Sequence, residues 1–327
     1  TIAIIPQISN NSDNIENNVF YDLDSSIIIY SNIDKKVFLN SVDNPLSLKD
    51  YKKINNFVKK KFNSKILAAC MPVGSASEYP HCFLNINKRY EKKRVVNQIL
   101  SQVKNKLKVI KPKFFFPAGG NYILYGKFLK LDKFIATPSF SDIVKKASVK
   151  GTKIVNLLSK KIVLENNIVK IKKLNPNSFY KNRKELKLKF KKFKYEYENK
   201  NLRISISNLD KLYNESLKKY YSRLNKGKMN TSWKIDFYLY RNLQLVDANK
   251  ILKNKNNLLK KYTLNYNNRS KKKQTLLECY LDIKLFILLL KRIHPWNPVL
   301  SGSMILFKRY PNKFDPNVTY SLNYLGL

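Results

Sequence analysis

The chain has 327 residues, 43% of them hydrophobic, which excludes wholesale disorder and allows one large domain or two smaller ones. Its 64 Lys and Arg residues against 22 Asp and Glu residues give a net charge of +42, as in proteins that bind nucleic acid or anionic surfaces. The alternative origin is an AT-rich coding bias, because the excess is mostly lysine, spread along the chain with abundant Asn, Ile, Tyr and Phe. Either origin favours weak, salt-sensitive, non-specific binding to polyanions.

The cysteines and the apolar runs indicate the compartment. Cys70, Cys82 and Cys279 have no paired spacing, which argues against a disulfide framework or a zinc knuckle and favours a reducing cytoplasm. The apolar stretch 281–290 is shorter than the roughly 18 residues that a membrane span needs, and it contains an Asp and a Lys. We therefore predict a cytoplasmic protein without a transmembrane segment.

The first half alternates short apolar runs with amphipathic segments, which favours a layered α/β domain. It opens with "TIAIIPQI", which reads as a strand already under way at Thr1, so the chain is expected to be a fragment lacking its natural N-terminus. The predicted elements, in order, are a hairpin over 25–41, a helix over 47–61 with Ser47 as N-cap, a strand over 65–71, a helix over 88–110, a strand over 114–116 and three short strands within 152–174.

The second half is more charged, with a composition shift near residue 175. Helical spacing predicts a helix over 206–227 that ends at Gly227. Residues 252–274 are expected to be a solvated connector, 276–293 a helix and 301–311 a strand. The predicted division is a domain over 1–174, a charged helical insert over 175–274 and a C-terminal module over 275–327 that packs back on the domain.

Asp43 directly follows the apolar run 37–39, at the end of a predicted strand. A carboxylate at the carboxyl end of a buried strand is well placed to point into a site. The alternative is an Asx-turn, in which Asp43 or Asn44 caps the turn before Pro45.

Residues 71–85, "MPVGSASEYPHCFLN", gather residue types that are rare elsewhere in this chain. The small residues 74–77 permit a ligand to approach the backbone closely, and Glu78, His81 and Cys82 can titrate or bind metal. The alternatives are a loop whose glycine serves conformation only and a histidine with a structural hydrogen bond. The later turn "PAGG" could present N–H groups to an anion or serve only as a tight strand exit.

No HxH or HExxH motif occurs, and the two histidines stand far apart, so spacing alone assembles no complete metal site. No Ser–His–Asp order is compelling either. From the residues, the prediction is an α/β domain with a small-residue loop site and a helical extension.

Three stretches taken in order resemble a known family: "DSSIIIYSNIDKKVFLNSVDNPLS", "GSASEYPHCF…KPKFFFPAGGNY" and "HPWNPVLSGSMILFKRYPNKFDP". Together they are similar to the metallo-β-lactamase-fold part of the CMP-N-acetylneuraminate hydroxylase-like proteins. Bacterial relatives are described as UDP-sugar hydroxylase-like or metal-dependent hydrolases, and N-acyl-phosphatidylethanolamine phospholipase D is more distant. The resemblance covers about 1–155 and 276–327.

The resemblance implies an αββα sandwich that lacks its N-terminal part, followed by a mostly helical extension. It implies a site where the loops after Leu39, Met71 and Phe116 converge at one sheet edge. The family's HxHxDH motif is absent, and Ala118–Gly119 stand where a late metal-binding His is expected. The full-length protein is expected to hold zinc or iron, with Asp43 as a candidate ligand and the others upstream of Thr1. Candidate substrate-binding residues are Gly74, Ser75, Ser77, Tyr79, His81, Gly119 and Gly120.

The leading hypothesis is a metal-dependent hydrolase or hydroxylase-like enzyme that acts on a small anionic substrate, namely a nucleotide sugar (such as a sialic acid nucleotide) or a related phosphorylated compound. One alternative is a basic RNA-binding or ribosome-associated protein. Another is a degenerate scaffold that kept the fold without catalysis.

Overall fold

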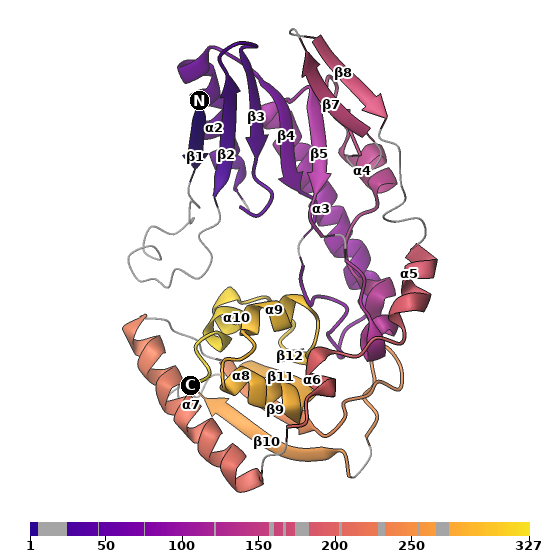
Figure 1. Cartoon of the computed structure of the whole chain (residues 1–327), viewed down its shortest axis with the longest axis vertical. Coiled ribbons are helices and arrows are strands. Elements are labelled where there is room, and N and C mark those ends of the chain that lie inside the picture. Colours follow the sequence, from indigo (N-terminus) through magenta and orange to yellow (C-terminus); the bar gives the residue numbers. More distant parts are fainter. Residues whose placement is uncertain are drawn as a thin grey trace.

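The computed structural model describes residues 1–5, 25–44, 46–74, 76–120, 122–156, 160–165, 168–173, 183–202, 205–227, 233–253, 256–265 and 275–327. They form a mixed α/β protein with two mixed sheets (Figure 1). One sheet is built by the N-terminal half and the other by the C-terminal half. Within these ranges, every helix is too short or too polar to cross a bilayer.

The first sheet has six strands in the order β1-β2-β3-β4-β5-β6. The strands β1 to β3 pair antiparallel, and β3 to β6 pair parallel. The predicted strand at the chain start, the hairpin and the strands that follow are confirmed. The bounds are Ile2–Ile5 for β1, Ser26–Ser31 for β2, Lys36–Asn40 for β3, Ile66–Pro72 for β4, Phe114–Ala118 for β5 and Lys153–Ile154 for β6.

Three helices cover one face of this sheet: α2 (Leu48–Phe62), α3 (Lys88–Ile110) and α4 (Phe140–Ala147). The helix α2 begins at Ser47, whose hydroxyl accepts a hydrogen bond from the Asp50 N–H while the Asp50 carboxylate binds the Ser47 N–H. This capping box confirms the predicted N-cap. The helices bury an apolar stripe against the strands, in a core that includes Ile28, Val37, Leu39, Tyr51, Val58, Leu107, Phe115 and Ile143.

The opposite face of the first sheet is apolar and partly open. Ile2 and Ile4 on β1 are 68% and 69% exposed, and Ile27 and Ile29 on β2 are 36% and 43% exposed. Strands with isoleucine on both faces are typical of sheets covered on both sides. We call the side bearing these four isoleucines the open face.

The second sheet has four strands in the order β10-β9-β11-β12, with β9 and β11 parallel and the other pairs antiparallel. The helix predicted over 206–227 is confirmed as α7, which ends at Gly227. The strands are β9 (Trp233–Tyr240), β10 (Leu258–Asn265), β11 (Thr275–Asp282) and β12 (Leu306–Tyr310), and the helices are α7 (Ile206–Lys226), α8 (Ile283–Leu290), α9 (Trp296–Ser301) and α10 (Pro316–Leu322).

This second sheet corrects four sequence predictions. The helix predicted over 276–293 is a strand as far as Asp282 and a helix only from Ile283. A continuous apolar run that is buried on both faces gives no periodicity with which to tell strand from helix. The predicted connector 252–274 contains β10, and the expected mostly helical extension is therefore a sheet with helices packed on it. The boundary expected at 274/275 falls inside this sheet, because β9 pairs with β11.

The remaining elements join or flank the two sheets. In Figure 1, α3 extends from the C-terminal half, in the lower part of the view, up behind the first sheet. The predicted strands near residue 160 form a separate hairpin. These elements are the hairpin β7 (Lys160–Glu165) and β8 (Ile168–Lys173), the 3₁₀ helix η1 (Gly126–Phe134), and the helices α5 (Arg183–Phe190) and α6 (Glu196–Asn199).

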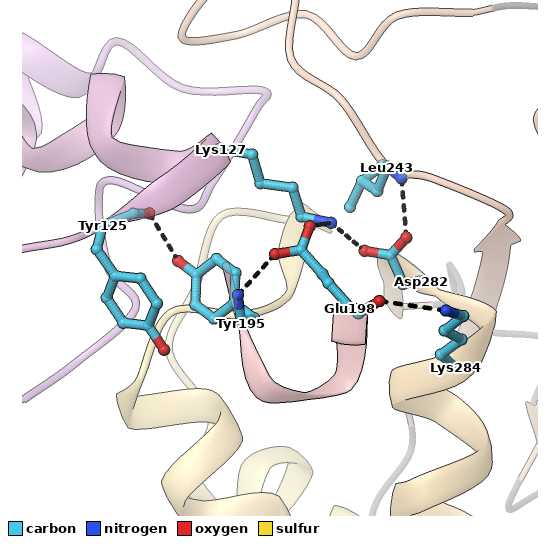
Figure 2. Close-up of polar contacts among 7 residues, drawn as sticks. All are labelled: Tyr125, Lys127, Tyr195, Glu198, Leu243, Asp282 and Lys284. Atoms are coloured by element: carbon cyan, nitrogen blue, oxygen red, sulfur yellow. Dashed lines mark hydrogen bonds and ion pairs between the residues drawn. The ribbon is translucent and has the colours of Figure 1, made fainter. Parts of the chain in front are cut away.

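A buried ion cluster ties η1 to the second sheet (Figure 2). The Lys127 ammonium on η1 contacts the Asp282 carboxylate at the end of β11 and lies 3.2 Å from the Glu198 carboxylate on α6. Asp282 also accepts a hydrogen bond from the Leu243 N–H at 3.0 Å, and Glu198 accepts one from the Tyr195 N–H at 2.7 Å. The buried Asp282 carboxylate and the half-buried Glu198 carboxylate therefore each have both a cation and a backbone donor, which offsets their loss of hydration.

Lys127→Met is expected to lower the free energy of unfolding by about 3 to 5 kcal/mol, because it leaves the buried Asp282 carboxylate without its cation. Urea unfolding of Lys127→Met, Asp282→Asn and the double variant measures the coupling. The double variant is expected to lose clearly less than the sum of the single losses. Lys133→Met, at an exposed lysine of the same helix, is the matched control. Additive losses would contradict the ion cluster as described.

Candidate functional site

The loops that follow β3, β4 and β5 meet at one edge of the first sheet. The Ser41 N–H donates to the Cys70 carbonyl at 2.9 Å, and the Val73 N–H donates to the Ala118 carbonyl at 2.9 Å. These bonds continue the parallel pairing just beyond the strands. The carboxyl edge of parallel strands is the place where α/β sheets bind ligands, so the loops predicted to converge do lie next to each other.

The glycines of the two adjoining loops serve the contact between the loops. Gly119 and Gly120 have φ of +75° and +73°, and a Cβ on Gly120 would lie 2.9 Å from the Gly74 Cα. The Thr137 hydroxyl donates to the Gly120 carbonyl at 2.7 Å. Close approach of one backbone to another therefore accounts for these glycines. Their predicted contact with a substrate stays a prediction.

A cavity of about 230 Å³ lies beside this edge, between the first sheet's loops, α3 and the segment that follows β12. Two arginines and a glutamate line it together with hydroxyl and amide groups, and aliphatic and aromatic side chains form the rest of its wall. The lining residues are Ser77, Glu78, Tyr79, Arg94, Val95, Ile99, Tyr122, Ile135, Ala136, Thr137, Arg309, Asn312 and Phe314.

Tyr79 and Arg94 are held by Glu91, on the first turn of α3. The Tyr79 hydroxyl donates to the Glu91 carboxylate at 2.6 Å, and the Arg94 Nε and Nη2 lie 2.8 and 2.7 Å from the same oxygen. The Tyr79 hydroxyl also accepts a hydrogen bond from the Asn312 amide at 3.2 Å. One carboxylate thereby fixes a hydroxyl and a guanidinium on the cavity wall.

Arg309, on β12, brings a second guanidinium to the cavity. It stacks over the rings of Phe83 and Tyr79, 4.8 and 5.3 Å from their centroids, and its Nη2 donates to the Asn312 amide oxygen at 2.9 Å. Its Nε is buried and has no hydrogen-bond partner in the part of the chain that the structure describes. Burial lowers the pKa of Arg309, with Tyr79 and Glu78 opposing, and the guanidinium stays protonated.

Glu78 places a carboxyl group on the same wall. Burial raises the pKa of this carboxyl, whereas a backbone hydrogen bond and the charge of Arg309 lower it. Glu78 and Arg309 also line a second cavity of about 20 Å³ on the side of Trp233 and Leu277, which has room for about one water molecule. These two side chains therefore close the larger cavity on that side.

His81 lies behind the wall, fully buried, and does not line the cavity. Its Nε2 is 2.6 Å from the Ser303 hydroxyl, and its Nδ1 has no partner among the described residues. Ser303 has a φ of +60° and hydrogen-bonds Tyr122, which donates to the Ser77 carbonyl at 2.9 Å. His81 therefore makes a structural hydrogen bond, which was the alternative considered from sequence. Its contacts join the loop after β4 to the turn before β12.

Asp43 lies exposed in the turn after β3. The side chain that closes this turn is Asn40, whose amide oxygen accepts the Val42 N–H at 3.2 Å. Within the described ranges, no group of three or more His, Cys, Asp and Glu side chains could hold a metal ion. The residues present do not by themselves fit the metal that the resemblance implies, so no chemical step is derived through one, and Asp43 as a ligand stays a prediction.

Two of the predicted substrate-binding residues, Ser77 and Tyr79, line the cavity, and Gly74 and Gly120 lie next to its Thr137 wall. Ser75 lies outside the described residues. Arg94, Glu78 and Arg309 also line the cavity, but they were not among the substrate-binding residues predicted from sequence. The spacing of Glu91 and Arg94 on one helix face offered a signal for Arg94. No local signal placed Arg309 beside a loop more than two hundred residues earlier.

Comparison of this chain with protein-family models, with curated proteins and with solved structures found no match.

Acid is expected to destabilise the protein through His81. Burial lowers the pKa of His81 to about 3, Lys88 adds to this and Asp132 opposes it, whereas an unfolded histidine has a pKa of about 6.5. Between these values only the unfolded state takes up the proton, so stability falls as the pH falls below about 6.5. The loss at about pH 5 is about 2 kcal/mol.

Urea unfolding at about pH 7.5 and about pH 5 measures this loss. His81→Gln is expected to flatten the pH dependence by that amount, and His294→Gln, at the other histidine, is the matched control that keeps the contribution of His81. An unchanged pH dependence in His81→Gln would show that the buried neutral histidine is not its source.

Proposed function

We propose that this protein is a metallo-β-lactamase-fold hydrolase or hydroxylase-like enzyme that acts on a nucleotide sugar or a related phosphorylated compound. In this proposal, residues 77–137 and 309–314 supply the wall that binds the substrate. The observation that carries it is the cavity at the carboxyl edge of the parallel strands, with Arg94 and Arg309 on its wall. The family and the reaction class come from the resemblance, and the cavity supports an anionic substrate.

The charge of the wall supports an anionic substrate. Arg94 and Arg309 outnumber Glu78 among the charged lining residues. Guanidinium groups bind phosphate and carboxylate through paired, charge-assisted hydrogen bonds. The net charge of +42 adds a field that attracts anions over longer distances.

The open face of the first sheet supports the sandwich part of the proposal. In an αββα sandwich, helices cover the outer face of each sheet and the inner faces pack together. Here α2, α3 and α4 cover one face, and the open face carries Ile2, Ile4, Ile27 and Ile29. This is the residue type expected on the inner face of such a sandwich.

Within the cavity, each group has a role in binding or orientation. Arg309 and Arg94 bind the anionic group, and Tyr79 and Asn312 orient it. Val95, Ile99 and Phe314 exclude water from one side of the substrate. These roles concern the binding and orientation of the substrate.

The test is turnover of nucleotide sugars, such as UDP-N-acetylglucosamine and CMP-N-acetylneuraminate, by the purified protein supplied with zinc or iron. Chromatography and mass spectrometry detect cleaved or hydroxylated product. Arg309→Met is expected to lower kcat/KM about tenfold to a hundredfold, since a hydrogen bond to a charged group contributes about 1.5 to 3 kcal/mol.

Lys308→Met is the matched control, because Lys308 neighbours Arg309 on β12 and does not line the cavity. Absence of any product, or equal losses in the two variants, would count against the proposed function.

A further inference from the structure

The larger cavity also limits what it can enclose. Its volume of about 230 Å³ is below the range of about 300 to 1,000 Å³ for pockets that enclose whole drug-sized ligands. A complete nucleotide sugar therefore does not fit, whereas a single six-membered ring with its substituents does.

The lining distinguishes two sides of such a ligand. Val95, Ile99, Ile135 and Phe314 provide aliphatic and aromatic surface, which suits the C–H face of a ring. Glu78 provides a carboxyl group on the wall, which can accept a hydrogen bond from a hydroxyl group of the ligand. A ring that carries hydroxyl groups satisfies both sides.

Arg309 is the residue that favours an anionic group on the ligand. Its guanidinium is held in place by two aromatic rings and by Asn312. The group lines the cavity and stays protonated, so an anionic oxygen of a ligand can bind it through charge-assisted hydrogen bonds. The Arg94 fork is already shared with Glu91, so its contribution is mainly its charge.

We infer that this cavity binds one hydroxylated ring bearing a carboxylate or a phosphate, with Arg309 on the anion and Glu78 on a ring hydroxyl, and that any nucleotide stays outside. The inference rests on the proposed function in taking the cavity as the substrate site. It goes further in naming the part of the substrate that the cavity encloses.

Isothermal titration calorimetry with glucose 6-phosphate, glucuronate, glucose, inorganic phosphate and UMP tests the inference. Glucose 6-phosphate or glucuronate is expected to bind about tenfold or more tightly than glucose, inorganic phosphate and UMP. The ratio between the first two tells phosphate from carboxylate. Each titration is repeated at about 0.15 M and about 0.5 M salt. The higher salt concentration screens the non-specific attraction of anions to exposed lysines. Equal binding of glucose, of phosphate alone or of UMP, or no binding of either ring anion, overturns the inference.

Two variants assign the contacts. Arg309→Met is expected to weaken the preferred ring anion about tenfold or more, and Lys308→Met is expected to leave it unchanged. Glu78→Met is expected to weaken the ring anion without changing the affinity for inorganic phosphate, because phosphate alone has no ring hydroxyl to present. Thermal melting confirms that each variant is folded. Equal weakening of both ligands by Glu78→Met, or no effect of Arg309→Met, contradicts the assignment.

Binding and turnover separate this inference from the proposed function. Turnover of nucleotide sugars without binding of the ring anions rejects the inference and leaves the enzyme proposal standing. Binding of a ring anion without turnover of nucleotide sugars supports the inference and counts against the proposed enzyme activity.

Discussion

The pairing of the loop after β4 with β12 is the contact on which the site depends. The Phe307 N–H donates to the Cys82 carbonyl at 2.9 Å, and the Leu84 N–H donates to the Phe307 carbonyl at 2.7 Å. The ring of Phe83 stacks on that of Phe307, with centroids 5.3 Å apart. This short bridge brings β12 beside the loop of Tyr79 and so places Arg309 on the wall of the cavity.

Buried polar contacts reinforce the same junction. His81 contacts Ser303 just before β12. The Asn85 side-chain amide donates its N–H to the Arg309 carbonyl, and its oxygen accepts the Arg309 N–H. The Lys127 cluster fixes η1 to the far end of β11. Because buried polar groups tolerate little misalignment before they lose their partners, these contacts select one arrangement of the two sheets. The cavity inherits its shape from that arrangement.

Local patterns predicted most of the first half correctly, because its helices and strands have clear periodicity and strong end signals. The helix α3 has its predicted bounds, and Ser47 caps α2 as expected. The second sheet was missed because β11 is buried on both faces and β10 lies within a sequence rich in lysine and asparagine, so neither shows a clear strand pattern. Tyr79 was among the predicted residues because its small-residue loop with Tyr–Pro belongs to the stretches that carry the family resemblance. Arg309 reaches the site only through long-range strand pairing, which a single sequence does not encode in any local pattern.

The open face of the first sheet sets two forces against each other in solution. Four exposed isoleucines favour association with any other apolar surface, and this attraction does not weaken as salt is added. The net charge of +42 keeps copies apart, but its range shrinks from about 10 Å at 0.1 M salt to about 3 Å at 1 M. Raising the ionic strength is therefore expected to weaken any attraction to polyanions and at the same time to favour self-association. Conditions chosen to suppress one of these interactions are expected to favour the other.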